Sequence, residues 1–201
     1  STAELACDGN GRILALRVRT LANIGAYPTG PGAAIPLVVG PKVLTTLYDI
    51  PCFSLEVASY LTNTVPMGAY RGAGRPEAIY LMERLIQKTA EDMKINPLDF
   101  RRRNFIPSDK MPYTTAIGET YDSGDFEKVL EKALVTSDWK GFEKRRKTAE
   151  AKGLLRGRGV SCYIEWTGAV WHEEVTTEAQ ADGNVVLYTG TQNMGQGLQT
   201  A

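Results

Sequence analysis

Apolar and polar residues alternate along the first part of the chain, as they do in strands with one buried face. The alternation runs from Ala3 to Cys7 and again from Ile13 to Val18, on both sides of the turn sequence Asp8-Gly9-Asn10-Gly11. This arrangement predicts a β-hairpin. A third alternating run, from Cys52 to Leu61, predicts another strand, and the stretch 26–41, rich in Gly and Pro, predicts a loop.

After Gly74 the spacing of the apolar residues becomes that of a helix. They form a stripe made of Ala78, Ile79, Met82, Leu85, Ile86 and Met93. Pro76 suits a first helical turn and Glu77 suits the positive end of a helix dipole, so a helix of about five turns is expected. Asn96-Pro97 predicts the start of a second, shorter helix, which stops by Pro107.

The second half of the chain passes from helical back to strand patterning. Residues 107–123 are rich in turn formers, Asp125–Leu134 has helical spacing, and Asp138–Arg158 is a basic stretch that we interpret as a solvated helix. Strands are then expected over Val160–Trp166, Val175–Ala181 and Val185–Thr189, the last two joined by a tight turn at Asp182-Gly183-Asn184.

These elements predict an α+β fold with mixed or antiparallel sheets and packed helices. Two strand-rich parts are expected, residues 1–107 and 156–201, joined by a helical connector over 108–155. Strand patterning has just ended where the sequence stops at Ala201, which is the pattern expected of a piece of a larger fold.

Composition narrows the function classes. The 201 residues include 23 basic and 23 acidic side chains, so net charge gives no reason to expect a nucleic-acid partner. No apolar run reaches the length of a membrane span and no signal-peptide pattern is present, so we expect a cytoplasmic protein without membrane insertion. The cysteines, Cys7, Cys52 and Cys162, lie far apart and are expected to be buried, reduced thiols, and no metal ligand is expected in this chain.

Two glycine-rich segments carry the candidate chemistry: Gly68–Glu77, with the sequence GAYRGAGRPE, and Gly190–Gly197, with the sequence GTQNMGQG. In the first, glycines allow close backbone approach, the following helix offers free amide groups, and Arg71 and Arg75 offer forked cations for oxyanions. In the second, Gln196 between two glycines has an amide that both donates and accepts. Neither segment fits a P-loop or dinucleotide fingerprint, and each alone could be a plain turn.

Together with their surroundings these segments resemble the large subunits of molybdenum hydroxylases, the family of xanthine dehydrogenase, aldehyde oxidase and aerobic carbon monoxide dehydrogenase. The likeness covers nearly the whole chain. It rests on GAYRGAGRPEA, Glu83-Arg84-Leu85-Ile86, the run Leu98–Pro107, Tyr121–Phe126, Gly157-Arg158-Gly159 and the ending TGTQNMGQGLQT, in that order.

The resemblance implies an oxidoreductase that hydroxylates aldehydes or N-heteroaromatic compounds with oxygen from water. Its cofactor would be molybdenum held by molybdopterin cytosine dinucleotide, without a protein ligand to the metal. Iron-sulfur clusters and FAD would lie on partner subunits or domains, and the other partner would be a small-molecule substrate. The protein's own task would be binding, orientation and electrostatics.

The resemblance also assigns residues. Arg71 matches the catalytic arginine beside the metal centre, and Tyr70, Gly72, Ala73 and Gly74 would shape the floor of the pocket. Gly195, Gln196 and Gly197 match a loop that approaches the cofactor. The family's general base and one further glycine-rich segment match nothing within this chain, so we expect the isolated chain to be inactive.

Two alternatives remain open on the sequence. One is a non-catalytic assembly or binding module, and the other is a carbon monoxide dehydrogenase large-chain homologue. The members specialised for carbon monoxide carry a copper-binding cysteine at the position of Gly72. Because glycine offers no thiolate for copper(I), the resemblance favours an aldehyde or N-heteroaromatic substrate.

Overall fold

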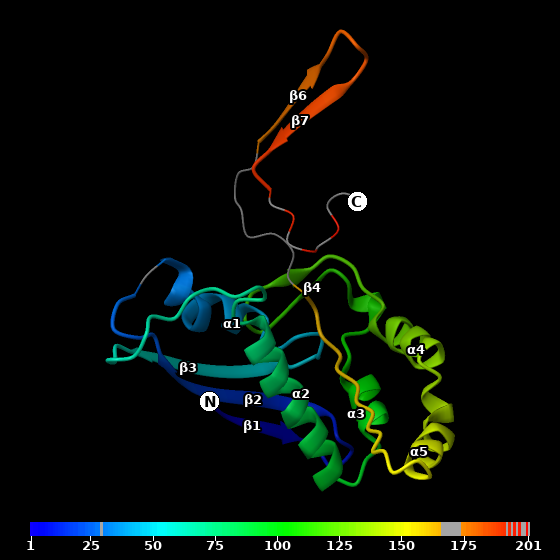
Figure 1. Ribbon diagram of the computed structural model, residues 1–201. Coiled ribbons are helices and arrows are strands. Elements are labelled where there is room, and N and C mark those ends of the chain that lie inside the picture. The colour runs from blue at the N-terminus through cyan, green and yellow to red at the C-terminus, as the bar shows by residue number, and fades with distance from the viewer. Residues whose placement is uncertain are drawn as a thin grey trace. The chain divides into compact units, whose positions relative to one another are not determined.

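The computed structural model of the chain describes residues 1–28, 30–165, 174–191, 193, 195, 197 and 200. They belong to two compact units, Ser1–Glu165 and Trp166–Ala201. The first unit holds a three-stranded sheet and all the helices of the described residues (Figure 1). The second holds a two-stranded hairpin. Helices and small mixed or antiparallel sheets confirm the predicted α+β class.

The sheet of the first unit has the strand order β1-β2-β3. The predicted hairpin is confirmed, since β1 (Thr2–Cys7) pairs antiparallel with β2 (Ile13–Asn23). Strand β3 (Cys52–Tyr60) is confirmed as well, and it pairs parallel with β2, from Ala15↔Cys52 to Asn23↔Tyr60. The sheet is therefore mixed.

A parallel pair needs a connection that returns along the whole strand, and residues 24–51 provide it. The loop predicted over 26–41 is wrong in part, because short helical turns occupy much of it. They are η1 (Gly30–Gly32), the π-helical η2 (Ile35–Val39) and α1 (Gly40–Lys42). This connection packs close to the start of the next helix, since a Cβ on Gly40 would lie 3.3 Å from the Gly74 carbonyl oxygen.

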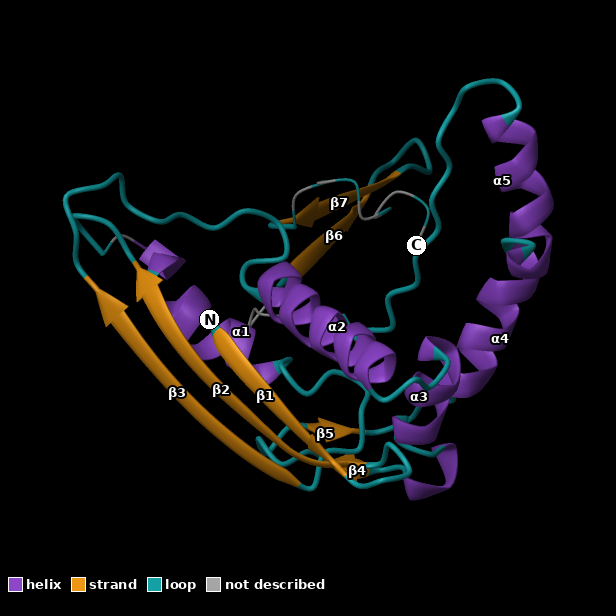
Figure 2. Ribbon diagram, turned by 90° about the horizontal axis from the view of Figure 1, so that it is seen from below, coloured by secondary structure: helices purple, strands orange, loops and turns teal. Residues whose placement is uncertain are grey.

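Helix α2 (Arg75–Asp92) covers one face of the sheet, as Figure 2 shows. Its buried apolar residues lie at intervals of four, namely Ala78, Met82, Ile86 and Ala90. The first three belong to the predicted stripe, whereas Ile79, Leu85 and Met93 of that stripe are only partly buried. Met82 and Ile86 are 0% exposed, so their burial contributes about 3–6 kcal/mol together at the usual value for a core side chain. The stripe thus fixes which face of α2 points inward.

Helix α3 (Pro97–Asn104) begins at the predicted cap, where the Asn96 side chain accepts a hydrogen bond from the Leu98 amide. At its other end Asn104 is completely buried. The Asn104 side chain accepts from the Ile13 amide at 2.8 Å and donates to the carbonyls of Gly11 and Phe100 at 2.8 and 2.9 Å. A single amide therefore ties the β1–β2 turn to α3.

The remainder of the first unit is a series of short elements. They are η3 (Ser108–Lys110), β4 (Tyr113–Thr114), β5 (Thr120–Tyr121), α4 (Phe126–Thr136), η4 (Trp139–Gly141) and α5 (Phe142–Glu150). The solvated helix predicted over Asp138–Arg158 is confirmed only in part, because α5 ends at Glu150 and residues 151–158 are not helical. Within α5 only Phe142 is buried. The Arg158 guanidinium lies 4.4 Å from the centre of the Trp139 ring and 4.6 Å from that of Phe142. These cation–π contacts hold the segment after α5 against η4 and the start of α5.

The strand predicted from Val160 to Trp166 is wrong over Val160–Glu165, which have no strand structure, and Trp166 lies outside the described residues. The amide of Cys162 donates to the Glu83 side chain at 3.1 Å. A side chain of α2 thus provides the partner that a neighbouring strand provides in a sheet, and alternation alone cannot distinguish the two cases.

In the second unit, β6 (Val175–Ala179) pairs antiparallel with β7 (Val185–Thr189). The turn predicted at Asp182-Gly183-Asn184 is confirmed, with Gly183 at φ +87°. Among the described residues, no helix is long and apolar enough to cross a bilayer.

Candidate active site

The Tyr70–Gly74 segment forms one tight turn directly before α2. The Ala73 amide donates to the Tyr70 carbonyl at 2.8 Å, and the Arg75 amide donates to the Gly72 carbonyl at 3.1 Å. Three consecutive residues have positive φ: Gly72 at +108°, Ala73 at +44° and Gly74 at +94°. Such a run turns the backbone sharply, and the structure brings all five predicted residues of this segment together in it.

The two glycines of the turn also have no space for a side chain. A Cβ on Gly72 would lie 2.8 Å from the Pro76 ring, and one on Gly74 would lie 2.9 Å from the Gly40 nitrogen and 3.0 Å from the Ile35 carbonyl oxygen. Gly72 and Gly74 therefore pack against the protein on the inner side of the turn, and the large side chains of the segment are exposed. Tyr70 is 88% exposed and Arg71 is exposed too.

The turn leads into the positive end of a helix of 18 residues. Pro76 stands in the first helical turn and has no amide hydrogen to leave unpaired, as the sequence predicts. An exposed guanidinium beside a helix start and a side-chain-free backbone is suited to an anionic group such as a phosphate or an oxo group.

Arg75 differs from Arg71, although both are potential oxyanion ligands in the sequence. The Arg75 side chain is only 12% exposed, its Nη1 donates to the Gly72 carbonyl at 3.0 Å, and its Nε lies 3.2 Å from Glu165 Oε1. Arg75 therefore binds protein groups on the inner side of the turn.

An apolar cavity of about 180 Å³ lies beside this turn. Its lining includes Ile35, Leu44, Leu55, Gly74 and Ala78. Because a mostly apolar lining offers few partners to a charged group, the outer face of the turn suits an anion better than this cavity does.

The second predicted loop belongs to the second unit. Gly195 and Gly197 have φ values of +86° and +85°, and the Gly195 amide donates to the Asn193 side chain at 3.3 Å. The Thr200 amide and hydroxyl both donate to the Gly197 carbonyl at 2.9 Å. Gly195 and Gly197 therefore have positive φ, as Gly72 and Gly74 have. Gln196, the predicted hydrogen-bonding residue, lies outside the described residues.

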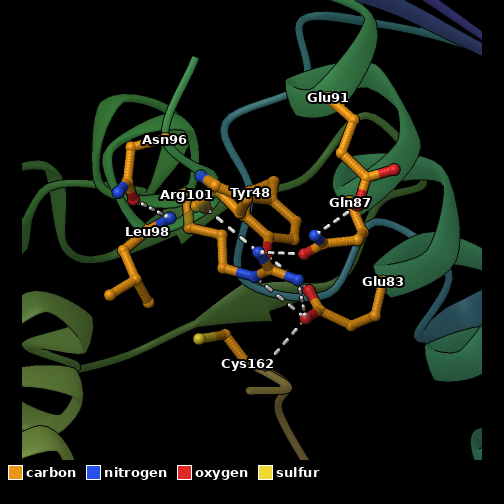
Figure 3. A network of polar contacts seen from close by, with 9 residues as sticks. Tyr48, Glu83, Gln87, Glu91, Asn96, Leu98, Arg101 and Cys162 are labelled. Carbon is orange, nitrogen blue, oxygen red and sulfur yellow. Dashed lines mark hydrogen bonds and ion pairs between the residues drawn. The ribbon is translucent and has the colours of Figure 1, made fainter. Parts of the chain in front are cut away.

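A buried polar network on α2 escaped the sequence analysis, and Figure 3 shows it at close range. Glu83 Oε1 accepts from the Tyr48 hydroxyl at 2.5 Å, and Oε2 accepts from Arg101 Nε and Nη2 at 3.1 and 3.0 Å and from the Cys162 amide at 3.1 Å. The Arg101 and Glu83 side chains are 1% and 9% exposed. Glu83 thus joins three segments that are far apart in sequence.

The network also perturbs its neighbours. Burial, reinforced by the Glu83 charge, raises the pKa of the Cys162 thiol to about 11, and burial raises the pKa of the Tyr48 phenol well above its usual value. Both groups stay neutral at physiological pH. The available signal was an acidic residue within the apolar stripe, at a position that points inward from the helix. The prediction that the cysteines are buried is wrong for Cys52, which is exposed, while Cys7 and Cys162 are partly buried.

Among the described residues, no group of three or more histidine, cysteine, aspartate or glutamate side chains is placed to hold a metal ion. The cationic side chains of the first turn are Arg71 and Arg75, and a guanidinium is a group that suits an anionic ligand.

Comparison with known proteins gives consistent results. Two family models, both described as a molybdopterin cofactor-binding domain, match residues 1–105 and 132–201. Over 99% of its length the chain is 30% identical to the nicotine 6-hydroxylase large subunit of Paenarthrobacter nicotinovorans, and over 98% it is 32% identical to the carbon monoxide dehydrogenase large chain of Hydrogenophaga pseudoflava. The match covers 26% of each relative, so the chain spans about a quarter of their length.

A solved structure agrees with these relatives. Quinoline 2-oxidoreductase from Pseudomonas putida 86 matches 97% of the chain with a TM-score of 0.86 and 31% identity, over 26% of that protein's chain.

Proposed function

Because the chain belongs to the molybdopterin cofactor-binding domain family, we propose that it is part of the large, catalytic subunit of a molybdenum hydroxylase. The subunit oxidises N-heteroaromatic compounds or aldehydes. The single observation that carries this proposal is the turn before α2, where packed glycines leave the Arg71 guanidinium exposed at the positive end of the helix. The relatives whose names specify nicotine or quinoline support a heteroaromatic substrate.

The residues of the turn fit an anionic cofactor. A Cβ on Gly72 or Gly74 would collide with neighbouring atoms, so only glycine keeps this backbone compact beneath the bound group. The exposed guanidinium is a planar fork with fixed geometry and permanent charge, which suits it to hold an oxygen atom in one orientation. Tyr70, Gly72, Ala73 and Gly74 would form the floor of the cofactor pocket.

The bound cofactor supplies the two-electron oxidation, and water supplies the oxygen atom. This chain's residues orient and stabilise. Arg71 is the catalytic residue, which donates to an oxygen that gains negative charge and so favours the transition state over the ground state. In the intact subunit Gly195, Gln196 and Gly197 would provide a second contact, in which the glycines would allow close approach and the Gln196 amide could donate and accept.

The finer assignments belong to the same proposal. The cofactor would be molybdopterin cytosine dinucleotide, iron-sulfur clusters and FAD on partner subunits or domains would take up the electrons, and the complex would be cytoplasmic. Residues 1–107 end a first cofactor-binding domain, residues 108–155 are a connector, and residues 156–201 begin a second domain.

The substrate class follows from Gly72. Copper next to the cofactor requires a thiolate at this position, and the turn as folded has φ +108° and no room for a Cβ. We therefore expect molybdenum without copper in the intact complex, together with activity on an aldehyde or N-heteroaromatic compound. Stoichiometric copper with robust carbon monoxide-dependent dye reduction would favour the carbon monoxide dehydrogenase alternative.

The experiment that tests the proposal uses the full-length subunit in its complex. Arg71→Ala should lower kcat by roughly 10² or more, the usual effect of removing one preorganised donor to a developing oxyanion. Arg19→Ala is the matched control, because Arg19 is an exposed arginine of β2 that pairs with Glu56. An unchanged kcat in Arg71→Ala would remove Arg71 from the site, and a wild-type complex without molybdenum would refute the proposed function.

A further inference from the structure

We propose that Arg75 and Glu165 form a positioning pair for the active-site turn. The inference rests on the proposed function, because the residue that the pair positions is Arg71. Neither member contacts the cofactor in this proposal. Arg75 holds the turn from the inner side, and its ion pair joins the turn to Glu165, the last residue of the first unit.

The Arg75 side chain contacts both the turn, at Gly72, and Glu165. Its Nη1 donates to the Gly72 carbonyl at 3.0 Å, within the positive-φ run, while its Nε lies 3.2 Å from Glu165 Oε1. The Gly72 carbonyl also accepts from the Arg75 amide at 3.1 Å. Gly72 directly follows Arg71, so a fixed Gly72 carbonyl limits the backbone angles that can reorient the Arg71 side chain.

A lysine cannot replace this arginine. The Arg75 guanidinium donates from Nη1 to the Gly72 carbonyl, and its Nε makes an ion-pair contact with Glu165 without a hydrogen bond. An ammonium group, by contrast, is a single point of charge on a flexible stem. The Arg75 side chain is 12% exposed and Glu165 is 54% exposed, so water partly screens the pair. Its effect on global stability is therefore small, and its proposed role lies in geometry.

A second contact, between Glu83 and the Cys162 amide, attaches the same segment to α2. Eight residues after Arg75 on the same helix, Glu83 accepts from the Cys162 amide, and Cys162 precedes Glu165 by three residues (Figure 3). Eight helical residues span about 12 Å, and three extended residues span about 10 Å. The segment 162–165 therefore runs along α2 in the opposite direction and is attached near both of its ends.

The experiment uses the full-length subunit in its complex, with the variants Arg75→Gln, Arg75→Lys and Glu165→Gln. Arg19→Gln is the control, since it removes an exposed arginine–glutamate pair on β2 and β3. The readouts are kcat and KM per bound molybdenum, the melting temperature, and the amide hydrogen exchange of residues 71–75 and 162–165. The exchange measurement does not depend on activity.

We expect all three variants to lower kcat per molybdenum roughly tenfold, with KM changed less than twofold. Amide exchange should rise in both segments, and the melting temperature should match that of the control. The double variant Arg75→Gln/Glu165→Gln should be no worse than the worse single variant, because the two residues act as one unit.

Unchanged exchange, or an unchanged kcat per molybdenum, would overturn the pair as a positioning device. A lower melting temperature with unchanged kcat per molybdenum would overturn it too, since it indicates a structural role only. If the wild-type complex contains no molybdenum, the proposed function fails, and the exchange of residues 71–75 and 162–165 still decides whether the pair holds the turn.

Discussion

Replacing Glu83 by glutamine should destabilise the first unit by about 3–5 kcal/mol, the usual cost of removing one partner from a buried ion pair. Glutamine keeps the shape of the side chain and removes its charge. Arg101, which is 1% exposed, is then left buried without its counter-ion, and an amide NH₂ group faces donors where a carboxylate accepted four hydrogen bonds. The predicted loss is a large fraction of the stability of an ordinary domain.

Urea titration of the 201-residue chain, followed by far-ultraviolet circular dichroism, measures this loss. With a slope of about 2 kcal/mol per molar urea, the midpoint should fall by about 1.5–2.5 M. The control is Lys88→Gln on the same helix, which removes an exposed pair with Asp92 and should leave the midpoint nearly unchanged. In a double-mutant cycle with Arg101→Met, the two effects should miss additivity by about 2 kcal/mol or more.

A Glu83→Gln midpoint equal to that of Lys88→Gln would refute this reasoning. It would mean that water screens the Glu83 charge in solution. Additivity in the cycle would mean that Glu83 and Arg101 stabilise the unit independently of one another, although they lie in contact.

Three further predictions follow from buried polar groups. Asn104→Ala should cost about 2–4 kcal/mol in the same titration, because it leaves the Ile13 amide and two carbonyls without their partner, and a loss below 1 kcal/mol would contradict this. Burial acts to raise the pKa of Asp49, but hydrogen bonds from Lys110 and Tyr113 and the charges of Lys110 and Arg12 lower it overall, so the stability that Asp49 contributes is complete above its ordinary value of 3.8 and is lost as pH falls further. Asp49→Asn should therefore lower the midpoint at pH 7 and flatten its decline between pH 4 and pH 2, and a decline as steep as that of the wild type would count against this assignment. With a thiol pKa of about 11, Cys162 is ionised in only about 10⁻³ of molecules at pH 8, so iodoacetamide should modify the exposed Cys52 first, as peptide mass mapping would show; faster labelling of Cys162 would mean that its segment opens.

Much of the fold could be predicted from local pattern. The alternation around Asp8–Gly11 predicted the β1–β2 hairpin, and the apolar stripe predicted α2. Both elements bury one face, so the period of the apolar residues distinguishes a strand from a helix. The cap at Asn96 gave the start of α3. Pairing over long distances could not be predicted this way. The parallel partner of β2 lies beyond the connection 24–51, and no residue within β3 specifies it.

The candidate site shows the same limit. Positive φ at Gly72 and Gly74 follows from their lack of a Cβ, and the turn was predictable for that reason. The different roles of Arg71 and Arg75 were not, because they depend on Glu165, ninety positions further along the chain. The strand expected over Val160–Glu165 failed for a similar reason, since the partner of the Cys162 amide is a side chain.

The Glu83 network also constrains how sequences of this family can diverge. A carboxylate that accepts from a tyrosine, an arginine and a backbone amide cannot be exchanged alone without leaving buried donors behind. Substitutions at positions 48, 83 and 101 should therefore occur together in homologues, as a change from a polar to an apolar triad, and intermediates with one member replaced should be rare. Because Cys162 contributes only its backbone amide, which every residue except proline has, position 162 should vary freely. Positions 48, 83 and 101 should change together.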